Sequence, residues 1–124
     1  MGYLILYYEV HDDVEQYLEF VELASFARQA KGLLDDDDVQ SLERKLIDNP
    51  KVGDVIAGTG GVRKLRISAR GKGTRGGARV IYYFRAMRGR VYLIAAYAKS
   101  AKEDVTADDK RYFRRLTTIL DDEG

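Results

Sequence analysis

The opening of the chain contains two runs in which aromatic and branched residues favour an extended backbone. Tyr3–Val10 is rich in such residues throughout, which predicts a strand. Tyr17–Leu23 alternates, so that Leu18 and Phe20 share one side of an extended chain, and it is expected to be the first strand of the main sheet. The polar HDDVEQ between the two runs predicts a turn, and hence a hairpin. Residues 1–16 are therefore interpreted as an N-terminal extension.

The next two segments carry apolar residues at helical spacing. Ser25 is positioned to cap a helix that runs to Leu34. The acidic quartet Asp35–Asp38 then opens a second helix, because carboxylates favour the positive end of the helix dipole and one of them can cap it. The apolar stripe of this helix consists of Val39, Leu42, Leu46 and Ile47. Asn49-Pro50 is expected to end the helix.

An irregular approach with several glycines, Lys51–Gly61, leads to the first of three further strand-like runs. In that run Leu65 and Ile67 alternate with Lys64 and Arg66, which predicts a strand with an apolar back and a cationic front.

The second and third runs, Ala78–Ala86 and Val91–Ala98, are joined by a short turn at Met87–Arg90. The predicted faces of the second run are Val80, Tyr82 and Phe84 on one side and Arg79, Ile81, Tyr83 and Arg85 on the other. The third run is almost entirely apolar, which is typical of a central strand. Since all the connections are short, including the loop Arg70–Gly77, the three runs are expected to form an antiparallel meander.

A polar link, Lys99–Val105, precedes the last predicted helix. Thr106 can cap this helix, with Asp109 three residues on in an approximate capping box. Its apolar stripe consists of Phe113, Leu116 and Leu120, and residues 121–124 are expected to fray. The expected fold class is α+β: an antiparallel sheet of about four strands packed with two N-terminal helices and a C-terminal helix.

The composition is that of one soluble domain. The chain has 124 residues, of which 45% are hydrophobic and 33% charged. No apolar run approaches the roughly 20 residues of a membrane helix, and no signal peptide is recognised, so a cytoplasmic location without membrane association is expected. The absence of cysteine and the single histidine exclude disulfides, thiolate metal sites and histidine clusters.

No cofactor and no metal are expected. A metal site and helix capping are the two interpretations of the acidic quartet Asp35–Asp38. Its four consecutive carboxylates lack the alternating ligand spacing of a calcium loop, which favours capping.

The distribution of charge is more informative than the net charge of +1. The segment from Val55 to Lys102 holds twelve of the chain's 21 Lys and Arg residues and none of its 20 Asp and Glu residues. The centre of the chain is thus cationic between two acidic flanks. Such a centre favours a polyanionic partner.

The glycine-rich loop does not match a nucleotide-binding motif. Gly71–Gly76 fits G-x-G-x-x-G, but a strand rather than a helix follows it, which excludes a dinucleotide fingerprint. Neither glycine cluster closes with Gly-Lys-Ser/Thr, which excludes a Walker A loop. A flexible hairpin loop and a basic loop that embraces a nucleic-acid backbone are the two interpretations, and three cations without an acid favour the second.

The cationic front offers phosphate chemistry. Lys64 and Arg66 project from one predicted strand and Arg79 from the next, so pairing of the strands would bring them within reach of one phosphate. The centre holds no cysteine, histidine or carboxylate, which leaves catalytic triads and paired-carboxylate hydrolysis unsupported. Arginine can hold a phosphodiester and stabilise developing charge, and a lysine among cations has a lowered pKa and can transfer a proton. With RNA, the 2′-hydroxyl is already a nucleophile.

Three blocks, Asn49–Arg66, Gly71–Phe84 and Tyr92–Asp109, together resemble the HigB-like branch of the RelE/ParE toxin superfamily. They read NP-x-x-GD-x-I-x-GTGG-x-RK-x-R, GKGTRGGARVIYYF and YLIAAYAKSAKEDVTADD. Each block is weak alone, but the three in this order are specific. The similarity covers residues 17–120, which are expected to form the toxin domain.

The resemblance implies a RelE-like fold and a ribosome-dependent endoribonuclease that cuts mRNA in the A site by attack of the 2′-hydroxyl. It also implies a cognate antitoxin, of helix-turn-helix HigA type, that holds the toxin inactive. The catalytic residues that it implies are Lys64, Arg66, Arg79 and Lys102. The cations expected to contact RNA or the ribosome are Arg63, Arg70, Lys72, Arg75 and Lys99.

The chain departs from the family pattern at one position. Where RelE has a tyrosine that stacks on a substrate base, this chain has Thr106, and Tyr83, Tyr97 or Tyr112 are the alternatives. Residues 1–16 have no counterpart in the family, which leaves open an extra strand, an antitoxin contact or a mis-called start. Two other functions also remain open: a ParE-like inhibitor of DNA gyrase and a noncatalytic RNA-binding module.

Overall fold

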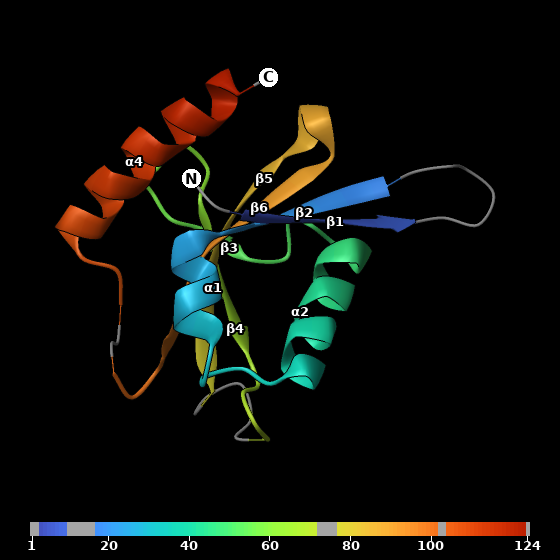
Figure 1. Cartoon of the computed structure of the whole chain (residues 1–124). Helices are drawn as coiled ribbons and strands as arrows, with labels where there is room; N and C mark the ends of the chain where they lie inside the picture. Colours follow the sequence, from blue (N-terminus) through green and yellow to red (C-terminus); the bar gives the residue numbers. More distant parts are fainter. Residues whose placement is uncertain (1–2, 10–16, 72–76, 102–103, 124) are drawn as a thin grey trace.

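The computed structural model describes residues 3–9, 17–71, 77–101 and 104–123 (Figure 1). Its elements in chain order are β1 (Tyr3–Glu9), β2 (Tyr17–Leu23), α1 (Ala24–Ala30), α2 (Asp36–Asp48), β3 (Asp54–Val55), β4 (Arg63–Ile67), β5 (Ala78–Arg85), the 3₁₀ helix η1 (Ala86–Arg88), β6 (Arg90–Ala98) and α4 (Ala107–Asp122). Within these ranges, none of the helices is both long and apolar enough to cross a membrane.

The six strands form one sheet in the order β1-β2-β6-β5-β4-β3. Strands β4, β5 and β6 make the predicted antiparallel meander, with β6 and β5 at the centre. The sheet is nevertheless mixed, because β2 runs parallel to β6. A parallel pair needs a long crossover, and here the helices and the rest of the meander lie between the two strands. The expectation of about four antiparallel strands is wrong on both counts, since β1 and β3 also extend the sheet.

The opening hairpin is confirmed. β1 pairs antiparallel with β2 along its whole length, from Tyr3 opposite Leu23 to Glu9 opposite Tyr17. The extension thus contributes an extra strand at the edge of the sheet. The predicted HDDVEQ turn lies outside the described residues. β3, by contrast, lies within the approach that was expected to be irregular.

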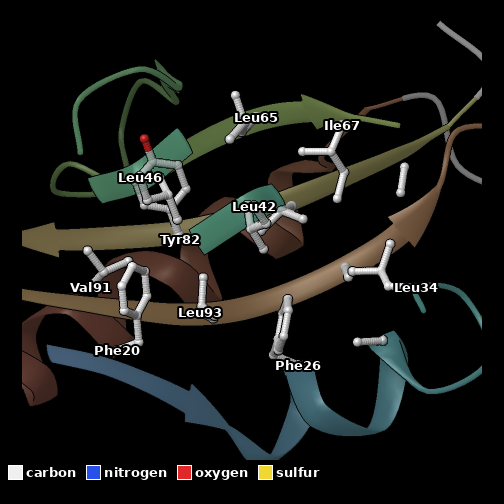
Figure 2. Close-up of a cluster of buried hydrophobic side chains, with 14 of the residues drawn as sticks. Phe20, Phe26, Leu34, Leu42, Leu46, Leu65, Ile67, Tyr82, Val91 and Leu93 are labelled. Carbon is white, nitrogen blue, oxygen red and sulfur yellow. The ribbon is translucent and has the colours of Figure 1, made fainter. Parts of the chain in front are cut away.

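Helices α1 and α2 cover one face of the sheet, where the larger hydrophobic core lies (Figure 2). Leu42 and Leu46 are fully buried, and Val39 and Ile47 pack at its margin, which confirms the predicted stripe of α2. The strand residues labelled in this core are Phe20, Leu65, Ile67, Tyr82, Val91 and Leu93.

Helix α4 covers the opposite face, and Figure 1 shows it across the strands from α2. Its predicted stripe of Phe113, Leu116 and Leu120 is buried. The stripe packs in a second core with strand residues that include Ile81, Tyr83, Tyr92 and Ile94. The two predicted faces of β5 therefore serve two different cores.

Both long helices begin with a capping box. Asp35 accepts a hydrogen bond from the Asp38 N–H at 2.8 Å, and Asp38 accepts one from the Asp35 N–H at 3.0 Å. Thr106 and Asp109 form the same arrangement at the start of α4. Capping of α2 by the acidic quartet is therefore confirmed. Among the described residues, no group of three or more His, Asp or Glu side chains is placed to hold a metal ion.

The prediction that Ser25 caps α1 is wrong. The helix begins at Ala24, with Leu23 at the N-cap position, and the Ser25 hydroxyl donates to the Ile94 carbonyl at 2.6 Å. The Gln29 side-chain oxygen accepts from the Ala96 N–H at 3.0 Å. Strand β2 pairs with β6 only as far as Leu93, so α1 supplies the hydrogen bonds that the free edge of β6 lacks.

Both predicted helix ends near residues 34 and 121 differ from the structure. Helix α1 ends at Ala30, and Gly32 adopts a φ of +84°, a conformation that glycine accepts at low cost. Helix α4 runs to Asp122, so it includes the first two residues of the segment that is expected to fray. The Tyr83 hydroxyl donates to the Asp121 carboxylate at 2.6 Å, which holds the last turn on the sheet.

Candidate functional site

Strands β4 and β5 place three predicted site residues on one face of the sheet. Arg66 and Arg79 are register partners, and opposite residues of an antiparallel pair project from the same face. Lys64 lies two residues from Arg66 and shares that face. Lys64, Arg66 and Arg79 are called the cation cluster below. The intervening Leu65 and Ile67 point into the core on the other face, as predicted.

The three cations differ in exposure. Arg66 is exposed and Lys64 is half-buried, whereas only 4% of Arg79 is exposed. A guanidinium nitrogen of Arg79 donates to the Ala78 carbonyl at 3.2 Å. Arg79 is therefore the buried member of the cluster, and its direct contact with a phosphate would require neighbouring side chains to move.

Two carboxylates stand beside Lys64. Asp104 Oδ1 lies 3.0 Å from Lys64 Nζ, and Asp54 on β3 is the register partner of Lys64. The hydrogen bond from Lys64, with lesser help from the Val105 N–H and the charges of Lys64 and Lys110, lowers the pKa of Asp104, so this carboxylate is ionised at neutral pH. The predicted cationic front therefore also carries acids, because Asp54 and Asp104, which lie outside the acid-free centre of the sequence, are brought beside Lys64 by the fold.

A cavity of about 200 Å³ lies on the same face. Tyr97 on β6 is the register partner of Arg79 and lines this cavity, and Tyr112 of α4 is another lining residue. Burial raises the pKa of the Tyr97 hydroxyl, and the charges of Asp104 and Asp109 raise it further, while Arg79 lowers it. Two of the three tyrosines considered as stacking residues thus lie at the cavity.

Thr106, which stands where the family has its stacking tyrosine, and the third candidate tyrosine, Tyr83, have structural roles. Thr106 caps α4, and Tyr83 is bonded to Asp121 near the opposite end of that helix. Neither Thr106 nor Tyr83 lines the cavity.

The predicted RNA-contacting residues are scattered. Arg63 donates to the carbonyls of Lys51 and Gly53 at 3.0 and 2.7 Å and so holds the approach to β3. Arg70 is exposed, and its N–H donates to Asp38 at 3.0 Å. Lys99 is half-buried after the end of β6. The predicted residues that lie outside the described ranges are Lys72, Arg75 and Lys102.

Four cations on α4 were missed by the sequence analysis. They are Lys110, Arg111, Arg114 and Arg115, of which the three arginines are exposed. The charge of Lys110 reaches Asp104, so the row begins near the cation cluster. The pattern K-R-x-x-R-R within the predicted C-terminal helix indicates this basic row. The excess of acidic residues in the C-terminal flank as a whole obscures it.

Comparison of the sequence with known protein families gives a match. The model of the family described as the RelE toxin of the RelE/RelB toxin-antitoxin system matches residues 21–123. The chain belongs to the RelE toxin family. It is thus a toxin of a toxin-antitoxin system, and a cognate antitoxin is its implied partner. The match includes the cation cluster and α4, whereas β1 lies outside it.

Proposed function

We propose that this RelE-family toxin is a ribosome-dependent endoribonuclease that cleaves mRNA in the A site. The observation that carries the proposal is the convergence of Lys64, Arg66 and Arg79 on one face of two paired strands. The proposal includes the HigB-like subtype and a helix-turn-helix antitoxin of HigA type, which the three sequence blocks support. Family members are generally ribonucleases, which supports the choice of reaction.

The reaction requires no nucleophile from the protein. The 2′-hydroxyl gives up its proton to solvent water as its oxygen attacks the adjacent phosphorus, the P–O5′ bond breaks, and the products are a 2′,3′-cyclic phosphate and a 5′-hydroxyl. Exposed Arg66 is suited to hold the non-bridging oxygens, where negative charge grows in the transition state. Lys64 is the candidate donor of the proton that O5′ needs as it leaves. Arg79, from beneath, adds positive charge in a region shielded from water.

The test is expression of the full chain from a tightly controlled promoter, with growth followed and mRNA ends mapped by primer extension. The variants are Lys64→Gln and Arg66→Ala, which alter accessible side chains, and Arg79→Ala, whose fold is checked by circular dichroism because this residue is buried. Arg88→Ala, at the exposed η1 turn, is the matched control. We expect growth arrest with new mRNA ends, both retained by the control and lost in the cluster variants.

Other outcomes would point elsewhere. Arrest without new mRNA ends but with gyrase-linked DNA damage would support a ParE-like inhibitor. RNA binding without arrest would indicate a noncatalytic module. Cleavage that survives the loss of both Lys64 and Arg79 would show that the cation cluster is not the site.

A further inference from the structure

The ion pair between Lys64 and Asp104 occupies the place where the cation cluster would receive a phosphate. The Asp104 oxygen lies 3.0 Å from Nζ, a distance at which a phosphate oxygen would also accept a hydrogen bond from an ammonium group. The Asp104 side chain is 69% exposed and that of Lys64 is 24% exposed. Solvent, and therefore a solute, can reach this contact.

Arg66 offers a second contact for the same ligand. It lies two residues along β4 on the same face, it is exposed, and the structure shows no ion pair for it with any described residue. A phosphodiester has two non-bridging oxygens and can accept from both side chains. The Asp104 carboxylate is held by its contact with Lys64 and by the Val105 N–H at 2.8 Å.

We propose that Asp104 takes the place of an RNA phosphate on Lys64 in the free toxin, and that a phosphodiester displaces it on binding. The identification of that phosphodiester as mRNA rests on the proposed function. The displaced carboxylate keeps favourable surroundings, since it remains exposed to water and within the influence of Lys110. Breaking the internal ion pair thus sets a threshold, a free-energy cost that any ligand of Lys64 must overcome. This cost favours a ligand able to engage Lys64 and Arg66 together over an isolated anion.

The threshold is small. An exposed ion pair contributes so little that its loss changes an affinity by no more than about fivefold. A ligand that also engages Arg66 recovers this cost, because hydrogen bonds between ionised groups are roughly twice as strong as neutral ones. The sign of the effect is diagnostic: a displaced carboxylate weakens RNA binding, whereas a carboxylate that positions Lys64 for RNA strengthens it.

The test measures the Kd of a fluorescein-labelled single-stranded oligodeoxynucleotide, which lacks the 2′-hydroxyl and is not cleaved, at fixed ionic strength. We expect Asp104→Asn to bind about three- to fivefold more tightly than the wild type. Asp54→Asn is the matched control, since Asp54 is an exposed carboxylate opposite the same lysine, with no ion pair shown within the described ranges. It should change the Kd by less than about half as much.

A double variant supplies the second arm. In Lys64→Gln the further change Asp104→Asn should no longer tighten binding, because the pair is already gone. Unchanged or weaker binding by Asp104→Asn, an equal gain from Asp54→Asn, or a gain that persists without Lys64 would each overturn the proposal. Because the probe is not cleaved, such a failure leaves the nuclease assignment to be judged by the mapped mRNA ends alone.

Discussion

The hydroxyl of Tyr82 joins the core to the turn that precedes the candidate site. The residue is fully buried, its oxygen accepts from the Gly53 N–H at 2.8 Å, and its proton goes to the Pro50 carbonyl at 2.9 Å. These two bonds fix the turn just before β3, where Asp54 stands opposite Lys64. The substitution Tyr82→Phe removes both bonds and leaves the ring in place.

The expected cost follows from the groups left behind. Loss of the hydroxyl leaves a buried N–H at Gly53 without a partner, and an unpaired buried donor costs about 1–3 kcal/mol. The carbonyl of Pro50 is only partly buried and can recruit water. We therefore expect Tyr82→Phe to lower the free energy of unfolding by about 2–3 kcal/mol, a large part of the 5–15 kcal/mol typical of a domain.

The assay is urea denaturation followed by circular dichroism, with Tyr83→Phe as the matched comparison. Tyr83 is the next residue of β5, and its single hydroxyl bond goes to Asp121, which is exposed. Its loss should cost about 1 kcal/mol. Equal m-values would show that both variants unfold from the same compact state. If Tyr82→Phe costs no more than Tyr83→Phe, the buried pair of hydrogen bonds does not hold the turn as inferred.

Four further predictions concern the same scaffold. Gly53→Ala should destabilise by about 1–3 kcal/mol in thermal melts, because the new Cβ would lie 2.8 Å from a ring carbon of Tyr82; an unchanged melting temperature would contradict this. Leu46→Ala, at a fully buried position, should cost about 2–5 kcal/mol in urea, and a loss below 1 kcal/mol would mean that the core collapses around the gap. Burial, and then the contact of its hydroxyl with the Asp121 carboxylate, raise the pKa of Tyr83 to about 12. The difference in unfolding free energy between wild type and Tyr83→Phe should therefore hold up to about pH 10 and vanish as the pH rises through 12. Burial, the largest single influence, raises the pKa of Asp38, but hydrogen bonds from two backbone N–H groups and its other contacts outweigh it and leave the pKa below 3.8. The stability advantage of wild type over Asp38→Asn, measured by urea denaturation, should therefore be full at pH 7 and decrease as the pH falls below about 4. An advantage that grows as the pH falls would contradict the assignment.

Features that depend on local periodicity were predictable from the sequence. The side of a strand on which Leu65 or Lys64 lies follows from alternation, and the buried face of α4 follows from the spacing of Phe113 and Leu116. The capping box at Thr106 depends on residues three positions apart. These contacts are set within a few residues, and so the pattern alone determines them.

Features that depend on which distant segments meet were not predictable in the same way. No local pattern states that β2 lies parallel to β6, or that α1 supplies the edge of β6 through Ser25 and Gln29. The pairing of Asp104 with Lys64 joins residues 40 positions apart. The charge count was correct along the chain, but the fold brings acids from the flanks onto the cationic face.

The burial of Arg79 shows that a residue to which the resemblance assigns a catalytic role need not be accessible to a ligand. Arg79 is one of the catalytic residues that the resemblance implies, yet it is the least accessible member of the cation cluster, with 4% of its surface exposed. Lys64 and Arg66, on a strand nearer the sheet edge, are the more accessible side chains of the cluster. The charge of buried Arg79 would act on a phosphate through a region of low dielectric constant, where water screens it poorly. If the chain is the nuclease proposed above, the site has two layers, an accessible one that would bind the phosphodiester and a buried one that would stabilise the charge developing on it.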